Sequence, residues 1–228
     1  MTGTLYIVAT PIGNLDDITF RAFEVLKSVD FVLAEDTRHS KTLLSHLDIS
    51  KPIRAFHEHN EREKTKAIIS EIYSGKSIAL ISDAGTPLIS DPGYFLVAQA
   101  KKEGLKVVPI PGPTALITAL SASGLASDSF TFLGFLPSKQ TARIKLLTGL
   151  AGRTETIIFY ESPKRVLATL TDMQAIFGDS REVCLAKELT KAFETIHTGS
   201  IPNLIEYLTI DQNHQKGEFL IWISATNE

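Results

Sequence analysis

A short apolar segment followed by a long polar loop, residues 77–93, constrains the fold more than any other part of the sequence. Residues 78–81 are all apolar, which predicts a strand buried on both faces of a sheet. The loop that follows is rich in Asp, Gly, Thr, Pro and Ser, which adopt special backbone angles or bond to their own backbone. Asp91 and Pro92 are typical of the N-cap and first position of a helix. This arrangement predicts a parallel α/β sheet, in which ligands bind beyond the carboxyl ends of the strands.

The same strand-and-helix alternation extends through the first half of the chain. We expect its strands at residues 5–9, 31–34, 53–56, 78–81 and 106–110. Each strand ends in a polar or Gly/Pro-rich loop, and a doubly wound parallel sheet collects such loops on one edge. After Gly124 the pattern changes to a mixture of strands and helices. The sequence therefore predicts two α/β domains, a doubly wound one at residues 1–115 and a mixed one at residues 116–228.

Composition narrows the functional classes. The chain is 43% apolar and 21% charged, and no apolar run approaches the length needed to span a bilayer. The N-terminus lacks the basic start of a signal peptide. Cys184 is the only cysteine, which excludes a disulfide framework and a cysteine-based zinc site. We therefore expect a cytoplasmic protein.

The charge distribution leaves nucleic-acid binding open. The net charge of −3 argues against it. Residues 138–165, however, contain two acidic and six basic side chains, the latter being Lys139, Arg143, Lys145, Arg153, Lys164 and Arg165. A local basic surface can bind phosphates even on an acidic protein, but a solvated helix face has the same composition.

Two polar segments follow predicted strands of the first domain. Residues 35–38 (Glu-Asp-Thr-Arg) offer a carboxylate and an arginine, which suit a general base and a phosphate clamp. Asp36 is equally suited to be the N-cap of the next helix. His57 and His59 suggest metal ligands, but no third well-spaced ligand accompanies them, so we expect no metal site. The sequence also lacks the glycine fingerprint of dinucleotide-binding folds and a P-loop lysine motif.

Seven segments of this sequence are similar to those of a known family, namely residues 5–15, 34–38, 56–61, 82–93, 109–115, 159–165 and 187–191. Together and in this order they resemble the bacterial 16S ribosomal RNA (cytidine-2′-O)-methyltransferases of the tetrapyrrole (corrin/porphyrin) methylase superfamily. The resemblance implies a homodimer of two-domain α/β subunits, with S-adenosylmethionine bound in the cleft between domains. It implies that the substrate is the ribose 2′-hydroxyl of a cytidine in the decoding region of 16S rRNA in the small ribosomal subunit.

The resemblance also implies roles for individual residues. The cofactor would contact Pro11, Asp83, Ala84, Gly85, Thr86, Pro87, Pro113, Thr114, Ala115, Tyr160, Leu189 and Gly217. The RNA would contact Arg38, Glu58, Asn60, Lys164 and Arg165. The 2′-hydroxyl proton would pass to Asp36, Glu161 or His57, and Asp36 is favoured because Arg38 beside it can hold the adjacent phosphate.

The sequence is therefore consistent with three functions. The first is methylation of ribosomal RNA, which the basic segment and residues 36–38 favour. The second is methylation of a tetrapyrrole or a protein side chain by the same fold. The third is a ribosome-assembly factor that binds the cofactor without turnover.

Overall fold

The computed structural model describes residues 2–225. The chain divides after Thr114 into two compact units, each built on its own five-stranded sheet. No helix within the described range is long and apolar enough to cross a membrane.

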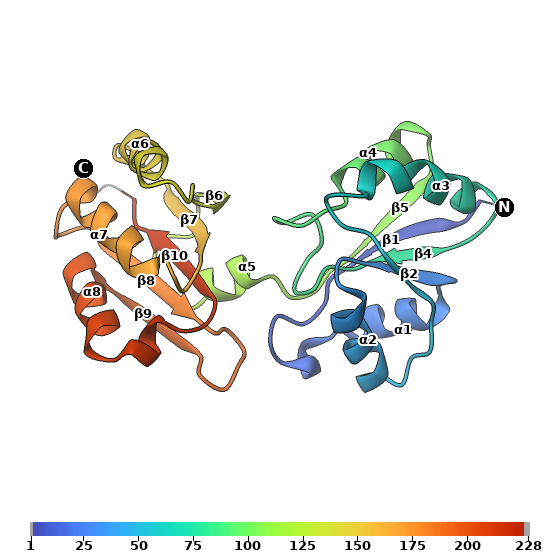
Figure 1. Cartoon of the computed structure of the whole chain (residues 1–228), viewed down its shortest axis with the longest axis horizontal. Helices are drawn as coiled ribbons and strands as arrows, with labels where there is room; N and C mark the ends of the chain where they lie inside the picture. The colour runs from blue at the N-terminus through green and yellow to red at the C-terminus, as the bar shows by residue number, and fades with distance from the viewer. Residues whose placement is uncertain (1, 226–228) are drawn as a thin grey trace. The chain divides into compact units, whose positions relative to one another are not determined.

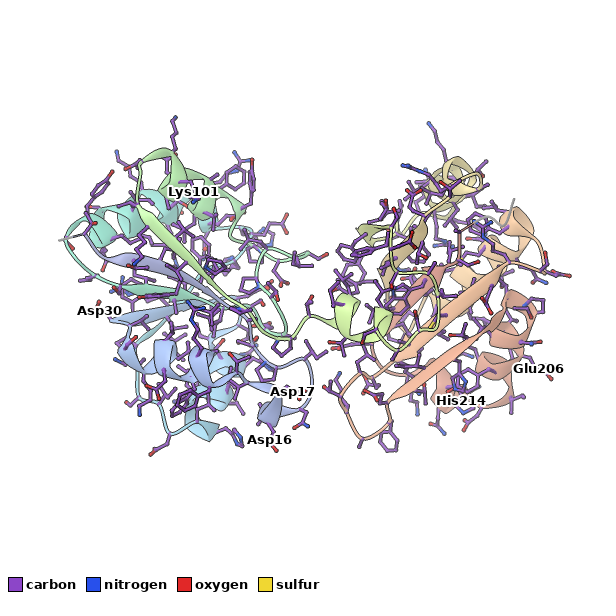
Figure 2. The ribbon with its side chains drawn as sticks, turned by 180° about the vertical axis from the view of Figure 1, so that it is seen from behind. Asp16, Asp17, Asp30, Lys101, Glu206 and His214 are labelled. Carbon is purple, nitrogen blue, oxygen red and sulfur yellow. The ribbon has the colours of Figure 1, made fainter. Side chains whose placement is uncertain are left out.

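The first unit contains a fully parallel sheet of order β3-β2-β4-β1-β5 (Figure 1). Its strands are β1 (Thr4–Val8), β2 (Phe31–Ala34), β3 (Ile53–Ala55), β4 (Ile78–Leu80) and β5 (Lys106–Ile110). The central strands lie in register, so that Leu5 of β1 pairs with Ile78 of β4 and Val107 of β5. At the amino end of the sheet, the side chain of Asp30 accepts a hydrogen bond from the N–H of Ser77 at 2.7 Å (Figure 2).

Helices cover both faces of this sheet. They are α1 (Phe20–Ser28), α2 (Thr37–His46), α3 (Glu61–Tyr73) and α4 (Tyr94–Lys102), with a short 3-10 helix at Leu15–Asp17. The side chains of Leu33 and Leu80 pack beneath α3 and α4. Those of Val32 and Ala79 pack on the opposite face with α1 and α2. Figure 1 shows these two pairs of helices on opposite sides of the sheet. Burial on both faces explains why the central strands are continuous apolar runs.

The start of α4 differs from the prediction. The helix begins at Tyr94 and Gly93 is its N-cap, so the expectation that Asp91 and Pro92 occupy the cap and first position is wrong. Gly93 has a φ of +127°, which a residue with a Cβ atom rarely adopts. Its N–H donates to Oε2 of the buried Glu61 at 2.9 Å. The acceptor at this helix end therefore comes from α3, and no local sequence pattern reveals it.

The second unit contains a mixed sheet of order β6-β7-β10-β8-β9. Its strands are β6 (Phe130–Phe135), β7 (Thr156–Glu161), β8 (Glu182–Lys187), β9 (Thr195–Ser200) and β10 (Phe219–Ile223). β6 and β7 are parallel, and the remaining neighbours are antiparallel. The helices are α5 (Ala115–Leu120), α6 (Gln140–Leu150), α7 (Val166–Phe177) and α8 (Ile201–Ile210), with a 3-10 helix at Gln212–Gln215.

Alternation along the strands separates the two faces of this second sheet. Phe159 packs in the core formed with α6, α7 and α8, and Glu161 bonds to Thr169 of α7. Tyr160, between them, points to the opposite face, where its ring contacts Phe132. This two-residue period is the ordinary geometry of a strand. Side chains of residues that are adjacent in this strand therefore lie on opposite faces of the sheet.

Candidate active site

The carboxyl edge of the first sheet gathers polar residues from several strands. Thr10 follows β1, Glu35 follows β2, His57 follows β3 and Asp83 follows β4. Because all five strands are parallel, their carboxyl ends meet at one edge. The structure thus assembles a site from segments that are far apart in the sequence.

Backbone contacts fix the loop around Gly85 at this edge. Gly85 and Thr10 exchange two backbone hydrogen bonds, of 2.9 and 3.0 Å. The hydroxyl of Thr86 donates to the carbonyl oxygen of Pro113 at 3.0 Å. The structure therefore brings together the predicted cofactor residues of the first unit, namely Pro11, Asp83, Ala84, Gly85, Thr86, Pro87, Pro113 and Thr114.

Gly85 forms a cradle that a larger residue would fill. Its φ is +81°, and an added Cβ would lie 3.4 Å from Cγ2 of Ile12 and 3.7 Å from the carbonyl oxygen of Pro113. A glycine here allows a ligand to approach the backbone closely. Backbone groups suit S-adenosylmethionine, which carries polar groups at its adenine and methionine ends. The residues at this edge therefore fit the predicted cofactor.

Two carboxylates near this loop, Glu35 and Asp91, have raised pKa values. Burial, together with the charge of Glu35, raises the pKa of Asp91 to about 6. Burial and the charge of Asp83 raise the pKa of Glu35. Oδ1 of Asp83 accepts the backbone N–H of Asp36 at 3.0 Å and so ties two strand ends together. Sequence reasoning assigned Asp91 only a helix-cap role and singled out no role for Glu35, although both stand within matched family segments.

Asp36 is both the cap of α2 and the partner of Arg38. Its Oδ1 accepts the backbone N–H of Arg38 at 2.8 Å, and its Oδ2 accepts from Nη2 of Arg38 at 2.9 Å. These hydrogen bonds lower the pKa of Asp36 to about 2. The side chain of Arg38 is 91% exposed. The helix-cap interpretation of Asp36 is therefore confirmed, and its role as a general base stays a prediction.

His57 and Asn60 form a closed local pair. The backbone N–H of His57 donates to Oδ1 of Asn60 at 3.0 Å, and Nδ2 of Asn60 lies 2.8 Å from Nε2 of His57. This orientation of the amide makes Nε2 an acceptor and places the imidazole proton on Nδ1. Nδ1 is buried and has no hydrogen-bond partner among residues 2–225. Glu58 beside it is exposed.

No metal site is present in the part of the chain that the structure describes. Among residues 2–225, no group of three or more His, Cys, Asp or Glu side chains is arranged to hold an ion. His57 and His59 lie with their ring centres 6.0 Å apart.

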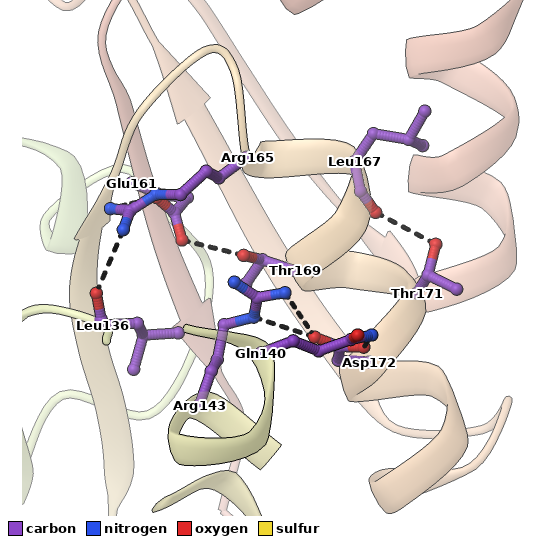
Figure 3. A network of polar contacts seen from close by, with 9 residues as sticks. All are labelled: Leu136, Gln140, Arg143, Glu161, Arg165, Leu167, Thr169, Thr171 and Asp172. Atoms are coloured by element: carbon purple, nitrogen blue, oxygen red, sulfur yellow. Dashed lines mark hydrogen bonds and ion pairs between the residues drawn. The ribbon is translucent and has the colours of Figure 1, made fainter. Parts of the chain in front are cut away.

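Glu161 is buried in a polar network of the second unit (Figure 3). Its carboxylate accepts hydrogen bonds from the N–H of Ser162, from Nε and Nη2 of Arg165, and from the hydroxyl of Thr169, all at 2.7–2.8 Å. The side chain is fully buried and faces α7, whereas Tyr160 faces the opposite side of the sheet. The structure therefore does not bring together the predicted proton acceptor Glu161 and the predicted cofactor residue Tyr160.

The basic segment does not form one phosphate-binding surface. Arg143 is 4% exposed and pairs with the equally buried Asp172, which Gln140 also contacts (Figure 3). Both interpretations from the sequence, phosphate contact and solvated face, are wrong for Arg143. Lys164 is exposed and available to a ligand, whereas Arg165 is held by Glu161.

The remaining predicted cofactor residues lie at the edge where β7 and β8 end. Phe219 of β10 pairs with Glu161 on one side and Lys187 on the other, so Tyr160, Leu189 and Gly217 lie near this edge. Gly217 has a φ of +101°, and a Cβ there would collide with the side chain of Glu188. Ala115 begins α5 of the same unit.

Comparison with known proteins places the chain among methyltransferases. Residues 4–205 match the sequence model of the family described as Tetrapyrrole (Corrin/Porphyrin) Methylases. The chain belongs to this family. Tetrapyrrole methylases depend on S-adenosylmethionine, and the predictions of superfamily, cofactor and α/β fold are confirmed.

Relatives of this tetrapyrrole methylase share more than half of its residues. It is 56% identical to ribosomal RNA small subunit methyltransferase I of Haemophilus influenzae, over 99% of this chain and 80% of that protein. The protein of the same name from Vibrio cholerae is 56% identical over 96% of this chain and 76% of that protein. The protein of the same name from Escherichia coli O157:H7 is 51% identical over 98% of this chain and 78% of that protein.

Solved structures of more distant proteins share the fold. A cobalt precorrin-4 methyltransferase superposes with a TM-score of 0.70 at 19% identity, over 97% of this chain and 94% of that one. Uroporphyrin-III-C-methyltransferase from Thermus thermophilus superposes with a TM-score of 0.66 at 18% identity, also over 97% of this chain and 94% of that one.

Proposed function

We propose that this chain transfers a methyl group from S-adenosylmethionine to the ribose 2′-hydroxyl of a cytidine in 16S ribosomal RNA. The observation that carries the proposal is identity of 51–56% to ribosomal RNA small subunit methyltransferases I over nearly the whole chain. The tetrapyrrole methyltransferases of like fold reach only 18–19%. We further propose the decoding region of the small subunit as the place of modification.

The cofactor site that we propose in the first unit consists mainly of backbone. The paired N–H and C=O groups of Thr10 and Gly85 hold the loop rigid, and Gly85 leaves room beside Ile12 and Pro113. When bound, S-adenosylmethionine supplies an electrophilic methyl group on a sulfonium sulfur. The chain must hold that group in line with the ribose oxygen, and a rigid loop reduces the entropy lost in doing so.

Asp36 is the group to which we assign the 2′-hydroxyl proton. As long as Arg38 holds it, its pKa is about 2, and a carboxylate of this pKa is a weak base. Arg38 is exposed, and an RNA phosphate competes with Asp36 for the same guanidinium. Loss of the Arg38 hydrogen bonds removes the main cause of the low pKa, so substrate binding itself makes Asp36 more basic.

His57 and Glu161 are weaker candidates for this role. Nε2 of His57 already accepts from Asn60, and the carboxylate of Glu161 is occupied by four donors. We propose instead that Glu161 positions Arg165, and that Arg38, Glu58, Asn60 and the exposed Lys164 contact RNA.

Methylation of a tetrapyrrole is the second candidate, because both superposed structures are named for such substrates. Cofactor binding without turnover is the third. One experiment separates all three: incubation of the chain with radiolabelled S-adenosylmethionine and unmethylated 30S particles, followed by nucleoside analysis. We expect label in 2′-O-methylcytidine. Label in an added tetrapyrrole alone, or in neither acceptor despite cofactor binding, would contradict the proposal.

We also propose that the chain works as a homodimer in the cytoplasm, where its ribosomal substrate is made. Ile117, Phe130 and Phe135 of the second unit are large apolar residues that remain 46%, 39% and 58% exposed. Exposed apolar side chains of this size are typical of interaction surfaces. Light scattering measures the mass directly, and a monomer at micromolar concentration would contradict the dimer.

A further inference from the structure

A pocket of about 680 Å³ lies in the second unit, on the side of its sheet that α8 covers. Lys187 at the end of β8 and Tyr207 of α8 both line it. Tyr160, the predicted cofactor contact, points to the other face of the same sheet. The volume falls in the range of small-molecule sites, about 300–1,000 Å³. The pocket therefore lies on the other face of this sheet from Tyr160, and Gly217, another predicted cofactor contact, lies in its wall.

Lys187 places a nearly buried cation in the wall of this pocket. Only 7% of the residue is exposed. Its Nζ donates to the backbone carbonyl oxygen of Asn213 at 2.8 Å, and it forms no ion pair with any residue in the range 2–225. A buried charge is normally paired, because leaving water without a counter-charge is costly. Glu188 beside it contributes a charge at longer range, and an anionic group in the pocket would supply a direct ion pair.

The wall of the pocket also contains Thr195, whose hydroxyl is a second hydrogen-bond donor. The hydroxyl of Thr195 is buried and has no hydrogen-bond partner within the described chain. Three carboxylates also line the pocket, and each accepts a backbone N–H: Glu188 from Glu218 at 2.9 Å, Asp211 from Asn213 at 2.8 Å, and Glu194 from Thr190 at 2.5 Å. Lys187 and Thr195 thus offer donors suited to a phosphate.

Aromatic rings form the rest of the pocket. His214 stacks on Tyr207 of α8, with ring centres 4.1 Å apart and planes 11° apart. Phe193 also lines the pocket and is 76% exposed. An exposed ring next to a phosphate-binding donor is the arrangement by which proteins bind a nucleotide, because every base has a face that stacks.

We propose that this pocket binds a nucleotide, with its phosphate at Lys187 and Thr195 and its base against Phe193. The nucleotide is either free or one unit of an RNA strand, since phosphate and base are common to both. The proposal goes beyond the methyl transfer proposed above and does not depend on it.

The test measures binding to the full-length chain. Cytidine and adenosine 5′-monophosphates are titrated by NMR, and a labelled single-stranded RNA hexanucleotide by fluorescence anisotropy. The variants are Lys187→Met, which keeps length without charge, and Phe193→Ala on the exposed rim. Lys101→Met is the matched control, because Lys101 projects into solvent from α4 of the first unit (Figure 2).

We expect Lys187→Met and Phe193→Ala each to weaken binding about tenfold, within the range measured for a lost base stack, and Lys101→Met to leave it unchanged. Loss for the hexanucleotide identifies an RNA unit as the ligand, and loss for the mononucleotides alone identifies a free nucleotide. Phe193→Ala keeps the test valid if Lys187→Met does not fold. Three results would overturn the proposal: no binding at millimolar nucleotide, binding unaffected by both substitutions, or displacement by saturating S-adenosylmethionine.

Discussion

Replacing Gly85 with valine separates cofactor contact from backbone strain. Gly85 has a φ of +81°, so any residue with a Cβ atom is strained there by about 1–2 kcal/mol. For a chain of this size, that strain lowers the melting temperature by roughly 2–8 °C. The added Cβ would also lie 3.4 Å from Ile12, and the valine methyl groups extend further into the space that we assign to the cofactor.

Gly104 provides the matched control. Its φ is +70°, and a Cβ there would meet nothing within 4 Å among the described residues. Gly104→Val therefore carries the same backbone strain without filling the cradle. The difference between the two variants isolates the steric effect at residue 85.

Isothermal titration calorimetry with S-adenosylmethionine measures that difference. We expect wild-type affinity for Gly104→Val and a loss of at least about tenfold, or 1.4 kcal/mol, for Gly85→Val. Similar melting temperatures for the two variants would show that the loss is not due to unfolding. Equal affinity in both variants would refute the reasoning, because the cofactor would then not approach the backbone at Gly85.

Four further predictions concern individual charged residues. Asp36→Asn should slow single-turnover methylation of 30S particles about 100-fold at unchanged melting temperature, because asparagine caps a helix as well as aspartate but accepts no proton; wild-type rates would exclude Asp36 from the chemistry. Lys164→Ala should reduce the salt dependence of RNA binding by about one unit of slope, and an unchanged slope would argue against a phosphate contact. Arg143→Met, in contrast, leaves the Asp172 carboxylate buried without a counter-charge, with Gln140 still bonded to it, and urea titration should show a loss of about 3–5 kcal/mol. Because burial raises the pKa of Asp91 to about 6, the folded state favours its protonated form. The free energy of unfolding should therefore fall as pH rises from about 4 to 6, and Asp91→Asn should abolish that part of the fall in urea titrations across this range.

Local patterns were sufficient to predict the sheet of the first unit. The apolar run at residues 78–81 became a central strand buried on both faces, because a parallel sheet covered by helices leaves no polar side to its strands. Asp36 could be recognised as a helix cap because a capping side chain bonds to a residue two positions away, here Arg38. The gathering of strand ends at one edge followed from parallel pairing alone.

The roles of the charged residues were decided only by tertiary structure. Arg143 looked like a surface cation until the fold placed Asp172 against it, and Glu161 looked accessible until Arg165 and Thr169 enclosed it. Lys187 carried no signal in the sequence that it would be buried with a backbone carbonyl as its hydrogen-bond partner. A residue's secondary structure depends on its near neighbours, whereas the protonation and accessibility of a side chain depend on partners that only folding brings into contact.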